Sequence, residues 1–224
     1  MKKILLAISV FTLALIGSVD GQTIRELKFP YEPGYTLNLS GEMTTVLQDG
    51  SKVKDSSFTY YYIDRAEDKD GLHWVNFQCN TSESSNMHLY ESLLALNESG
   101  MLYQSNAKKG SKKKKLVQAI SLPLTEGKIW YTNLEGMKAE CKCISTHTFV
   151  KTPFGDIDCF CVQTISIIQK LKGFNYKMRV LEFYNQEIGK VAYNAYYYYE
   201  KENGDAINVM EVKEVLADYG FKKK

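Results

Sequence analysis

Residues 35–47 read YTLNLSGEMTTVL, and the alternation of apolar and polar residues here indicates the class of fold. Its odd positions are mostly apolar, beginning with Tyr35, Leu37 and Leu39, whereas its even positions are mostly polar. An apolar residue at every second position is typical of a strand in an antiparallel sheet that buries one face and exposes the other. The Asp49-Gly50 pair that follows predicts a tight hairpin turn, because glycine adopts a positive φ without steric cost.

The same alternation continues along the rest of the chain. Asp70-Gly71 and Asn203-Gly204 predict further hairpin turns, and the connections between the apolar stretches are short. Besides 35–47, strands are predicted at 53–64, 72–79, 93–97, 101–104, 137–150, 157–169, 176–184, 191–200 and 207–217. Residues 86–96 and 211–219 have a spacing that would also fit a short helix.

About ten antiparallel strands in meander order would expose long edges if the sheet were flat. We therefore expect an all-β protein with little helix. Its architecture would be a strongly curved antiparallel meander sheet or a partly open β-barrel.

The first 21 residues have the pattern of an export signal. Lys2 and Lys3 precede an apolar run at 4–16, and small or turn-forming residues follow at 17–21. The run is shorter than the ~20 residues that a spanning helix needs, and no second run of sufficient length occurs. We predict a signal peptide over residues 1–21 and a mature chain without a membrane span. The protein would be exported to the periplasm, the cell envelope or the extracellular space.

Without the signal peptide about 200 residues remain, enough for one large β domain. Residues 107–115 read AKKGSKKKK, which is typical of a mobile loop or linker. The expected organisation is a single domain over 22–224, with two lobes, 22–106 and 116–224, as the alternative. The net charge of +2 falls to +1 once the charged residues of the signal peptide are removed, so nucleic acid is not an expected partner.

The chain has five cysteines, Cys79, Cys141, Cys143, Cys159 and Cys161. Neighbours in a C-x-C strand lie roughly 6.5–7 Å apart along the chain, which is too far for an unstrained disulfide. Cross-strand disulfides from Cys143 to Cys159 and from Cys141 to Cys161 are one arrangement. A tight turn centred on residues 153–154 would move the sulfurs apart, and the thiols would then be buried and free.

Catalytic and metal-binding chemistry have weaker support. A metal site would recruit His147, but structural zinc usually uses C-x₂₋₄-C knuckles on turns. A thiol nucleophile paired with His147 or His73 would need a lowered thiol pKa, which no spacing here supplies. Asp156 and Asp158 fit the solvated start of a strand better than a carboxylate pair. Because no nucleophile elbow, zinc helix, phosphate loop or dinucleotide motif occurs, we expect neither enzyme activity nor a cofactor.

The apolar side of the predicted sheet is the candidate binding surface. Six of its residues would line a cavity for a lipid or other hydrophobic small molecule, although a closed core would use the same residues. These candidates are Tyr35, Leu39, Val75, Phe77, Tyr193 and Tyr197. A glycan-binding or structural cell-surface module is the second hypothesis, with Trp74, Tyr198 and the lysine-rich loop as contacts to an envelope glycan.

Three segments carry a resemblance to a known family. Residues 150–160 read VKTPFGDIDCF, residues 184–191 read YNQEIGKV, and residues 122–130 read LPLTEGKIW. Together they resemble a family of exported bacterial β proteins of unknown function. The resemblance implies a curved antiparallel sheet similar to the periplasmic carriers of outer-membrane lipoproteins, whose concave side holds acyl chains. It implies no catalytic residue.

Overall fold

A computed structural model describes residues 22–83, 86–105, 115–134 and 137–221. The predicted signal peptide, residues 1–21, lies outside the described residues, and so does the basic loop except for its last residue, Lys115. Every regular element in the described part of the chain is a strand, so the all-β prediction is confirmed.

Twelve antiparallel strands form one sheet. They are β1 (Tyr35–Val46), β2 (Lys52–Lys69), β3 (Leu72–Glu83), β4 (Asn86–Asn97), β5 (Gly100–Ser105), β6 (Lys115–Ser121), β7 (Ile129–Leu134), β8 (Met137–Thr152), β9 (Gly155–Leu171), β10 (Phe174–Asn185), β11 (Gly189–Lys201) and β12 (Ala206–Phe221). Sequence reasoning missed β6 and β7. The strands on both sides of the basic loop belong to the same sheet, because β5 pairs with β6 and β1 pairs with β12.

The two segments with an alternative helical spacing are strands. Residues 86–96 belong to β4, which pairs along its length with β3, and residues 211–219 belong to β12. β12 pairs with a strand on each side, which satisfies its backbone hydrogen-bonding groups. Val212 and Leu216 lie on the same face of this strand and are buried, so the two-residue period of a strand is observed rather than the period of a helix. No helix in the described ranges is long and apolar enough to cross a bilayer.

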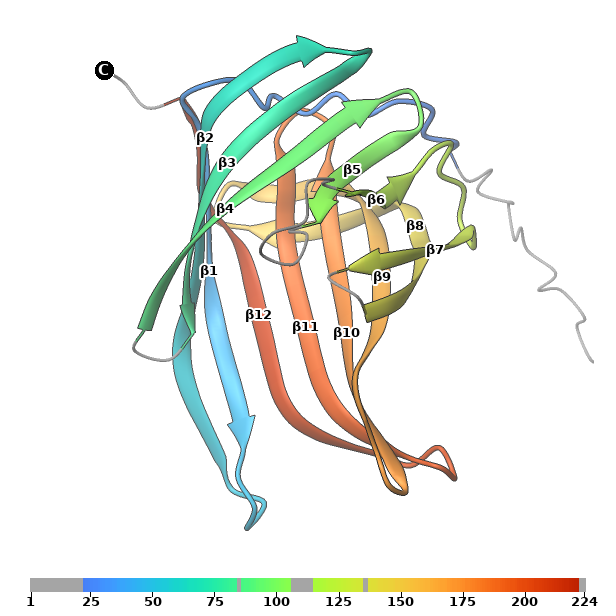
Figure 1. Cartoon of the computed structure of the whole chain (residues 1–224). Coiled ribbons are helices and arrows are strands. Elements are labelled where there is room, and N and C mark those ends of the chain that lie inside the picture. The colour runs from blue at the N-terminus through green and yellow to red at the C-terminus, as the bar shows by residue number, and fades with distance from the viewer. Residues whose placement is uncertain (1–21, 84–85, 106–114, 135–136, 222–224) are drawn as a thin grey trace, which may run out of the picture.

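The sheet curls into a nearly closed barrel with one unsealed seam (Figure 1). The strand order is β6-β5-β4-β3-β2-β1-β12-β11-β10-β9-β8-β7, so the first and last strands are hydrogen-bonded neighbours in its middle. Thr36 Oγ1 adds a hydrogen bond to the carbonyl of Gly220, at 2.9 Å. The two ends of the sheet, β6 and β7, are not paired with each other, and the seam lies between them.

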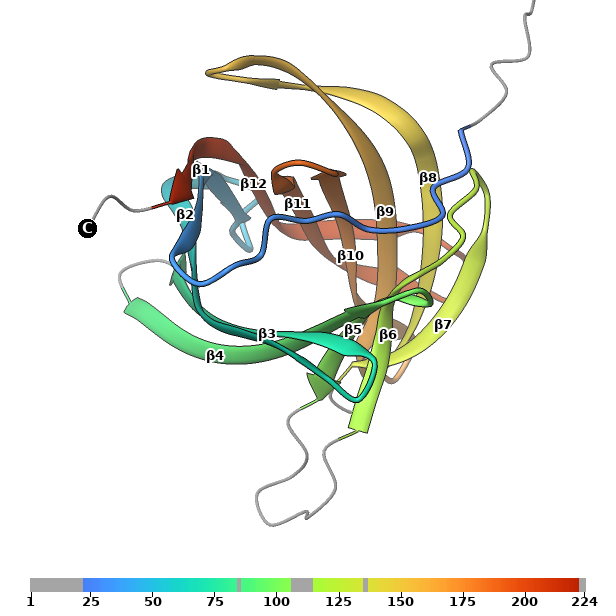
Figure 2. The same cartoon turned by 90° about the horizontal axis from the view of Figure 1, so that it is seen from above.

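Residues 22–34 cross the upper opening of the barrel, as the view from above shows (Figure 2). Phe29 packs against Tyr31, Phe160 and Tyr184, with ring centroids 5.1, 6.4 and 5.6 Å apart. Two hydrogen bonds with the side chain of Gln186 hold the backbone of this segment at Glu26 and Lys28. The segment therefore closes one end of the barrel with aromatic side chains.

The barrel interior is not one continuous apolar core. The larger cluster of buried side chains fills the end beneath residues 22–34, and its fully buried members include Val75, Val191 and Leu216. A smaller cluster contains Met43, Val180, Ala195 and Val212. Polar and charged side chains are also buried inside the barrel, and they form part of the candidate site.

Candidate functional site

The top of the seam is held shut by the connection between β6 and β7. Lys128 Nζ donates to the carbonyls of Ser121 and Pro123, at 2.9 and 2.8 Å. Ile24 and Leu124 form an antiparallel bridge, with backbone hydrogen bonds of 3.0 and 2.8 Å, which ties residues 22–34 to the same place. β6 and β7 are thus joined at one end of the seam, but they do not pair with each other along their length.

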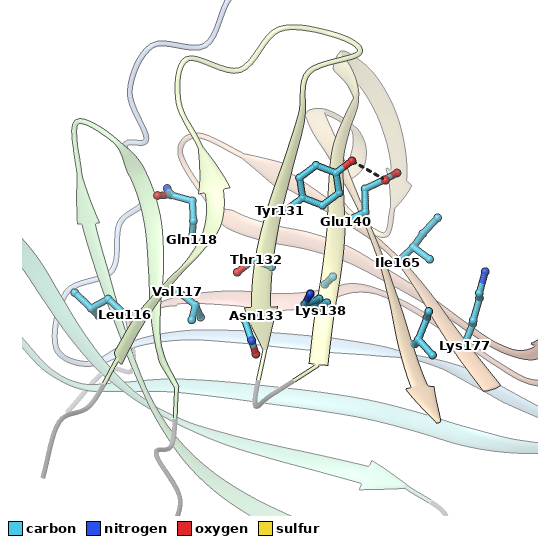
Figure 3. Close-up of a pocket in the computed structure, with 12 residues that line it drawn as sticks. Leu116, Val117, Gln118, Tyr131, Thr132, Asn133, Lys138, Glu140, Ile165 and Lys177 are labelled. Carbon is cyan, nitrogen blue, oxygen red and sulfur yellow. Dashed lines mark hydrogen bonds between the residues drawn. The ribbon is translucent and has the colours of Figure 1, made fainter. Parts of the chain in front are cut away.

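A groove of about 870 Å³ opens where β6 and β7 are unpaired (Figure 3), and we call it the seam groove. It is bordered by β6, β7, β8, β9 and the start of β10. Its lining residues are Leu116, Val117, Gln118, Tyr131, Thr132, Asn133, Lys138, Ala139, Glu140, Ile165, Ile167 and Lys177. This size falls within the roughly 300–1,000 Å³ that is usual for small-molecule sites.

The seam groove combines apolar walls with charges at its rim. Tyr131 on β7 is 75% exposed although it is a large aromatic residue, and its hydroxyl donates to Glu140 at 3.3 Å. Lys177 is paired with Glu200. The exposed Lys138 has no ion pair with a described residue, so its ammonium is available to a ligand.

A second candidate site lies inside the barrel and is built on a buried ion pair. Lys190 Nζ lies 2.6 Å from Glu182 Oε1, and the two side chains are 10% and 21% exposed. The same ammonium lies 5.3, 5.7 and 5.8 Å from the ring centroids of Tyr61, Tyr184 and Tyr193, which is within cation–π range. Three tyrosine faces and a carboxylate therefore surround one ammonium group.

Glu214 provides a second buried carboxylate in this region, and the residue is only 4% exposed. Burial raises the pKa of Glu214, while the hydroxyls of Ser57 and Thr59 and the charge of Lys190 act in the opposite direction. Ser57 Oγ donates to Oε1. Oε2 is buried and has no hydrogen-bond partner among the described residues.

Glu214 lines a pocket of about 160 Å³ within the barrel, which we call the interior pocket. Its lining residues are Met43, Ser57, Thr59, Tyr61, Thr81, Tyr193, Tyr197, Val212 and Glu214. Thr81 Oγ1 also lacks a hydrogen-bond partner in the described part of the chain. The lining is thus mainly hydroxyl groups and tyrosine rings around one carboxylate.

The six residues predicted to line a cavity are divided between core and pockets. Tyr35 and Val75 lie in the larger apolar cluster, with exposed fractions of 3% and 0%, and Leu39 is fully buried in the core. Phe77 borders a small void of about 20 Å³. Tyr193 and Tyr197 line the interior pocket. Trp74 and Tyr198 are half-buried on β3 and β11, which are separated by three strands of the sheet.

The buried charges and the seam groove were missed by sequence reasoning. Glu214 interrupts the apolar series Val212-x-Glu214-x-Leu216, and Glu182 interrupts Val180-x-Glu182-x-Tyr184. A carboxylate on the buried side of a strand costs free energy unless it has partners, and this is the signal that could have identified both residues.

All five cysteines are buried free thiols. Cys141 lies opposite Thr164, Cys143 opposite Val162, and Cys161 opposite Ser145, so the register that would pair Cys143 with Cys159 and Cys141 with Cys161 does not form. The hairpin turn falls at residues 153–154, between the partners Thr152 and Gly155, and the two irregularities in β8 are too small to restore the disulfide register. The arrangement with buried, free thiols is the one observed.

We expect none of the five thiols to react with iodoacetamide in the folded protein at pH 8. Burial raises the pKa of Cys141 and Cys143 to about 11 and that of Cys159 and Cys161 to about 12, so the reactive thiolate is scarce. Mass spectrometry should find no adduct before unfolding and five adducts after it. A single rapidly modified cysteine would contradict this expectation and support a thiol nucleophile.

The histidines predicted as partners of a thiol contact carboxylates. His147 Nδ1 lies 2.8 Å from Asp158 Oδ1, and His73 Nδ1 lies 2.8 Å from Asp68 Oδ1. Asp156 is exposed, at the hairpin between β8 and β9. No three His, Cys, Asp or Glu side chains in the described ranges gather closely enough to hold a metal ion.

Two solved structures are similar to this chain. One is a protein predicted to be exported, with a YmcC-like fold, from Bacteroides fragilis; it is 15% identical with a TM-score of 0.53, and the match covers 87% of this chain and 99% of that one. The other is a predicted lipoprotein from Parabacteroides distasonis, 11% identical with a TM-score of 0.51 and the same coverage. No protein-family model matches the sequence, and no curated protein matches it either.

These similarities establish the fold. The chain shares the barrel-like, all-β YmcC-like fold of proteins predicted to be exported, and the resemblance to exported bacterial β proteins is confirmed at this level.

Proposed function

We propose that the protein is a non-enzymatic component of the cell envelope that binds a single-chain anionic amphiphile, such as a fatty acid, in the seam groove. The observation that carries this proposal is the unpaired β6–β7 seam, which leaves a groove of about 870 Å³ beside buried barrel residues. The export pattern of residues 1–21 and the exported neighbours support a location in the envelope.

The chemistry of the groove suits an acyl chain with an acidic head. Leu116, Val117, Ile165 and Ile167 provide aliphatic walls, and each methylene that they cover would contribute about 0.8 kcal/mol to binding. Lys138, which pairs with no carboxylate in the described part of the chain, supplies a positive charge at the rim for the ligand's carboxylate. Ile129 and Tyr131 on the edge strand β7 are 49% and 75% exposed, and an acyl chain along this strand would cover apolar surface that is otherwise in water.

Binding of myristate by the mature protein, measured by isothermal titration calorimetry, tests the proposal. Replacing Ile165 in the groove wall, Ile165→Glu, places a charge against the acyl chain, and we expect the affinity to fall about tenfold or more, which is at least about 1.4 kcal/mol. Lys138→Gln should weaken binding about two- to fivefold, because it removes only an exposed ion pair.

The matched control is Ile207→Glu, because Ile207 is 52% exposed on β12 and does not line the seam groove. It should bind myristate as the unmodified protein does. Failure of myristate to bind at 100 μM, or equal affinities for Ile165→Glu and the control, would refute the proposal.

A further inference from the structure

The interior pocket has features that the proposed binding of an amphiphile does not use. No residue lines both the interior pocket and the seam groove. The interior pocket also differs in chemistry, since its only charged lining residue is Glu214 and most of the others carry hydroxyl groups.

The charges around the interior pocket do not balance. Glu214 is a buried carboxylate, and Glu182 is a largely buried one that pairs with the ammonium of Lys190 at 2.6 Å. Glu214 forms no salt bridge within the described residues, and its Oε2 accepts no hydrogen bond there although it is buried. A buried carboxylate oxygen without a partner costs roughly 1–3 kcal/mol or more, which a bound donor would offset.

The tyrosines around the pocket are suited to a positive charge. Tyr61 and Tyr193 already present their ring faces to the ammonium of Lys190, at 5.3 and 5.8 Å. Both residues also line the interior pocket, and Tyr197 adds a third ring to its wall. Several aromatic rings beside a carboxylate are the usual protein environment for alkylammonium groups.

We propose that the interior pocket binds a small organic cation, an alkylammonium group, between Glu214 and the rings of Tyr61, Tyr193 and Tyr197. The volume of about 160 Å³ suits a compact head of this kind; an apolar cavity of roughly 150 Å³ holds a benzene molecule. The ligand ammonium pairs with Glu214 as Lys190 pairs with Glu182, and Thr81 offers a hydroxyl to a polar substituent.

Choline and its uncharged carbon analogue, 3,3-dimethylbutan-1-ol, are probes of equal shape that differ in charge. Titrated into the mature protein and followed by NMR, choline should shift tyrosine resonances and bind at least tenfold more tightly than the alcohol. Glu214→Gln keeps the shape of the side chain and should weaken choline binding at least tenfold. Glu202→Gln, which removes an exposed carboxylate away from the pocket, should have no effect.

A second pair of variants tests the pocket without altering the buried carboxylate. Tyr197→Leu should weaken choline binding about threefold to tenfold, whereas Tyr197→Phe should bind like the unmodified protein, because the ring rather than the hydroxyl attracts the cation. Equal binding of choline and the alcohol, an unchanged affinity in Glu214→Gln, or no binding of choline at 10 mM would overturn the proposal. None of these results depends on whether myristate binds in the seam groove.

Discussion

Replacing the buried lysine by methionine, Lys190→Met, should lower the free energy of unfolding by about 3 kcal/mol or more, since removal of one partner leaves a buried charge uncompensated. The substitution retains most of the volume of the side chain but leaves Glu182, which is 21% exposed, without its ammonium. It also removes the positive charge from the three tyrosine faces. Urea unfolding monitored by circular dichroism measures the loss.

Two further variants establish that the loss arises from the unpaired carboxylate. Adding Glu182→Leu to Lys190→Met should restore much of the stability, because an apolar pair of similar volume often replaces a buried ion pair at little cost. Lys213→Met is the control, since Lys213 pairs with Glu211 at an exposed site and such pairs contribute about 0–1 kcal/mol. If Lys190→Met is no less stable than Lys213→Met, the buried ion pair between Lys190 and Glu182 does not stabilise the fold more than an exposed pair does.

Adding a single methyl group in the variant Gly41→Ala should prevent the barrel from closing normally. A Cβ atom on Gly41 would lie 1.7 Å from the backbone oxygen of Lys213 and 2.9 Å from the Cα of Glu214. Both contacts are with the backbone of the neighbouring strand, so no side-chain rotation relieves them. We expect a loss of more than about 4 kcal/mol, at the extreme of point substitutions, or no folded protein.

The yield of soluble protein and the far-ultraviolet circular dichroism spectrum measure the effect of Gly41→Ala. Ser40→Thr adds one carbon at the exposed neighbouring position and should change stability by no more than about 0.5 kcal/mol. A Gly41→Ala protein that unfolds within 1 kcal/mol of the unmodified protein would show that β1 and β12 can separate at this point without loss. The glycine therefore marks a place where the two strands approach unusually closely.

The fold could be predicted from the sequence wherever strands alternate cleanly. Residues 35–47 predicted β1. The predicted Asp70-Gly71 turn is also present, with positive φ angles of 55° at Asp70 and 73° at Gly71. The predicted curvature follows from the number of strands, because a flat sheet of that size would expose its edges. Alternation and turn motifs involve residues that are close together in the sequence, so a single sequence is enough to recognise them.

The candidate sites depend on features that local patterns do not carry. β6 and β7 were missed because β6 follows the basic loop directly and β7, IWYTNL, lacks clear alternation. These two strands border the seam groove, so its position could not be predicted. Similarly, Lys190, Glu182 and Glu214 come from three strands, and only the register across the sheet brings them together. The cysteine pairs are offset because the β8–β9 turn falls at residues 153–154, which is one of the two arrangements that the sequence left open.

The pairing of the first strand with the last has a consequence for how this molecule acquires its structure. Thr36 and Gly220 are hydrogen-bonded across 184 positions of the chain. Contacts so distant in sequence make folding slow, because a large loss of chain entropy precedes the stabilising interactions. β1 cannot gain its second partner until β12 has been synthesised, so the polypeptide can remain incompletely folded throughout translation. Such delay is compatible with secretion of an unfolded chain and completion of the barrel afterwards.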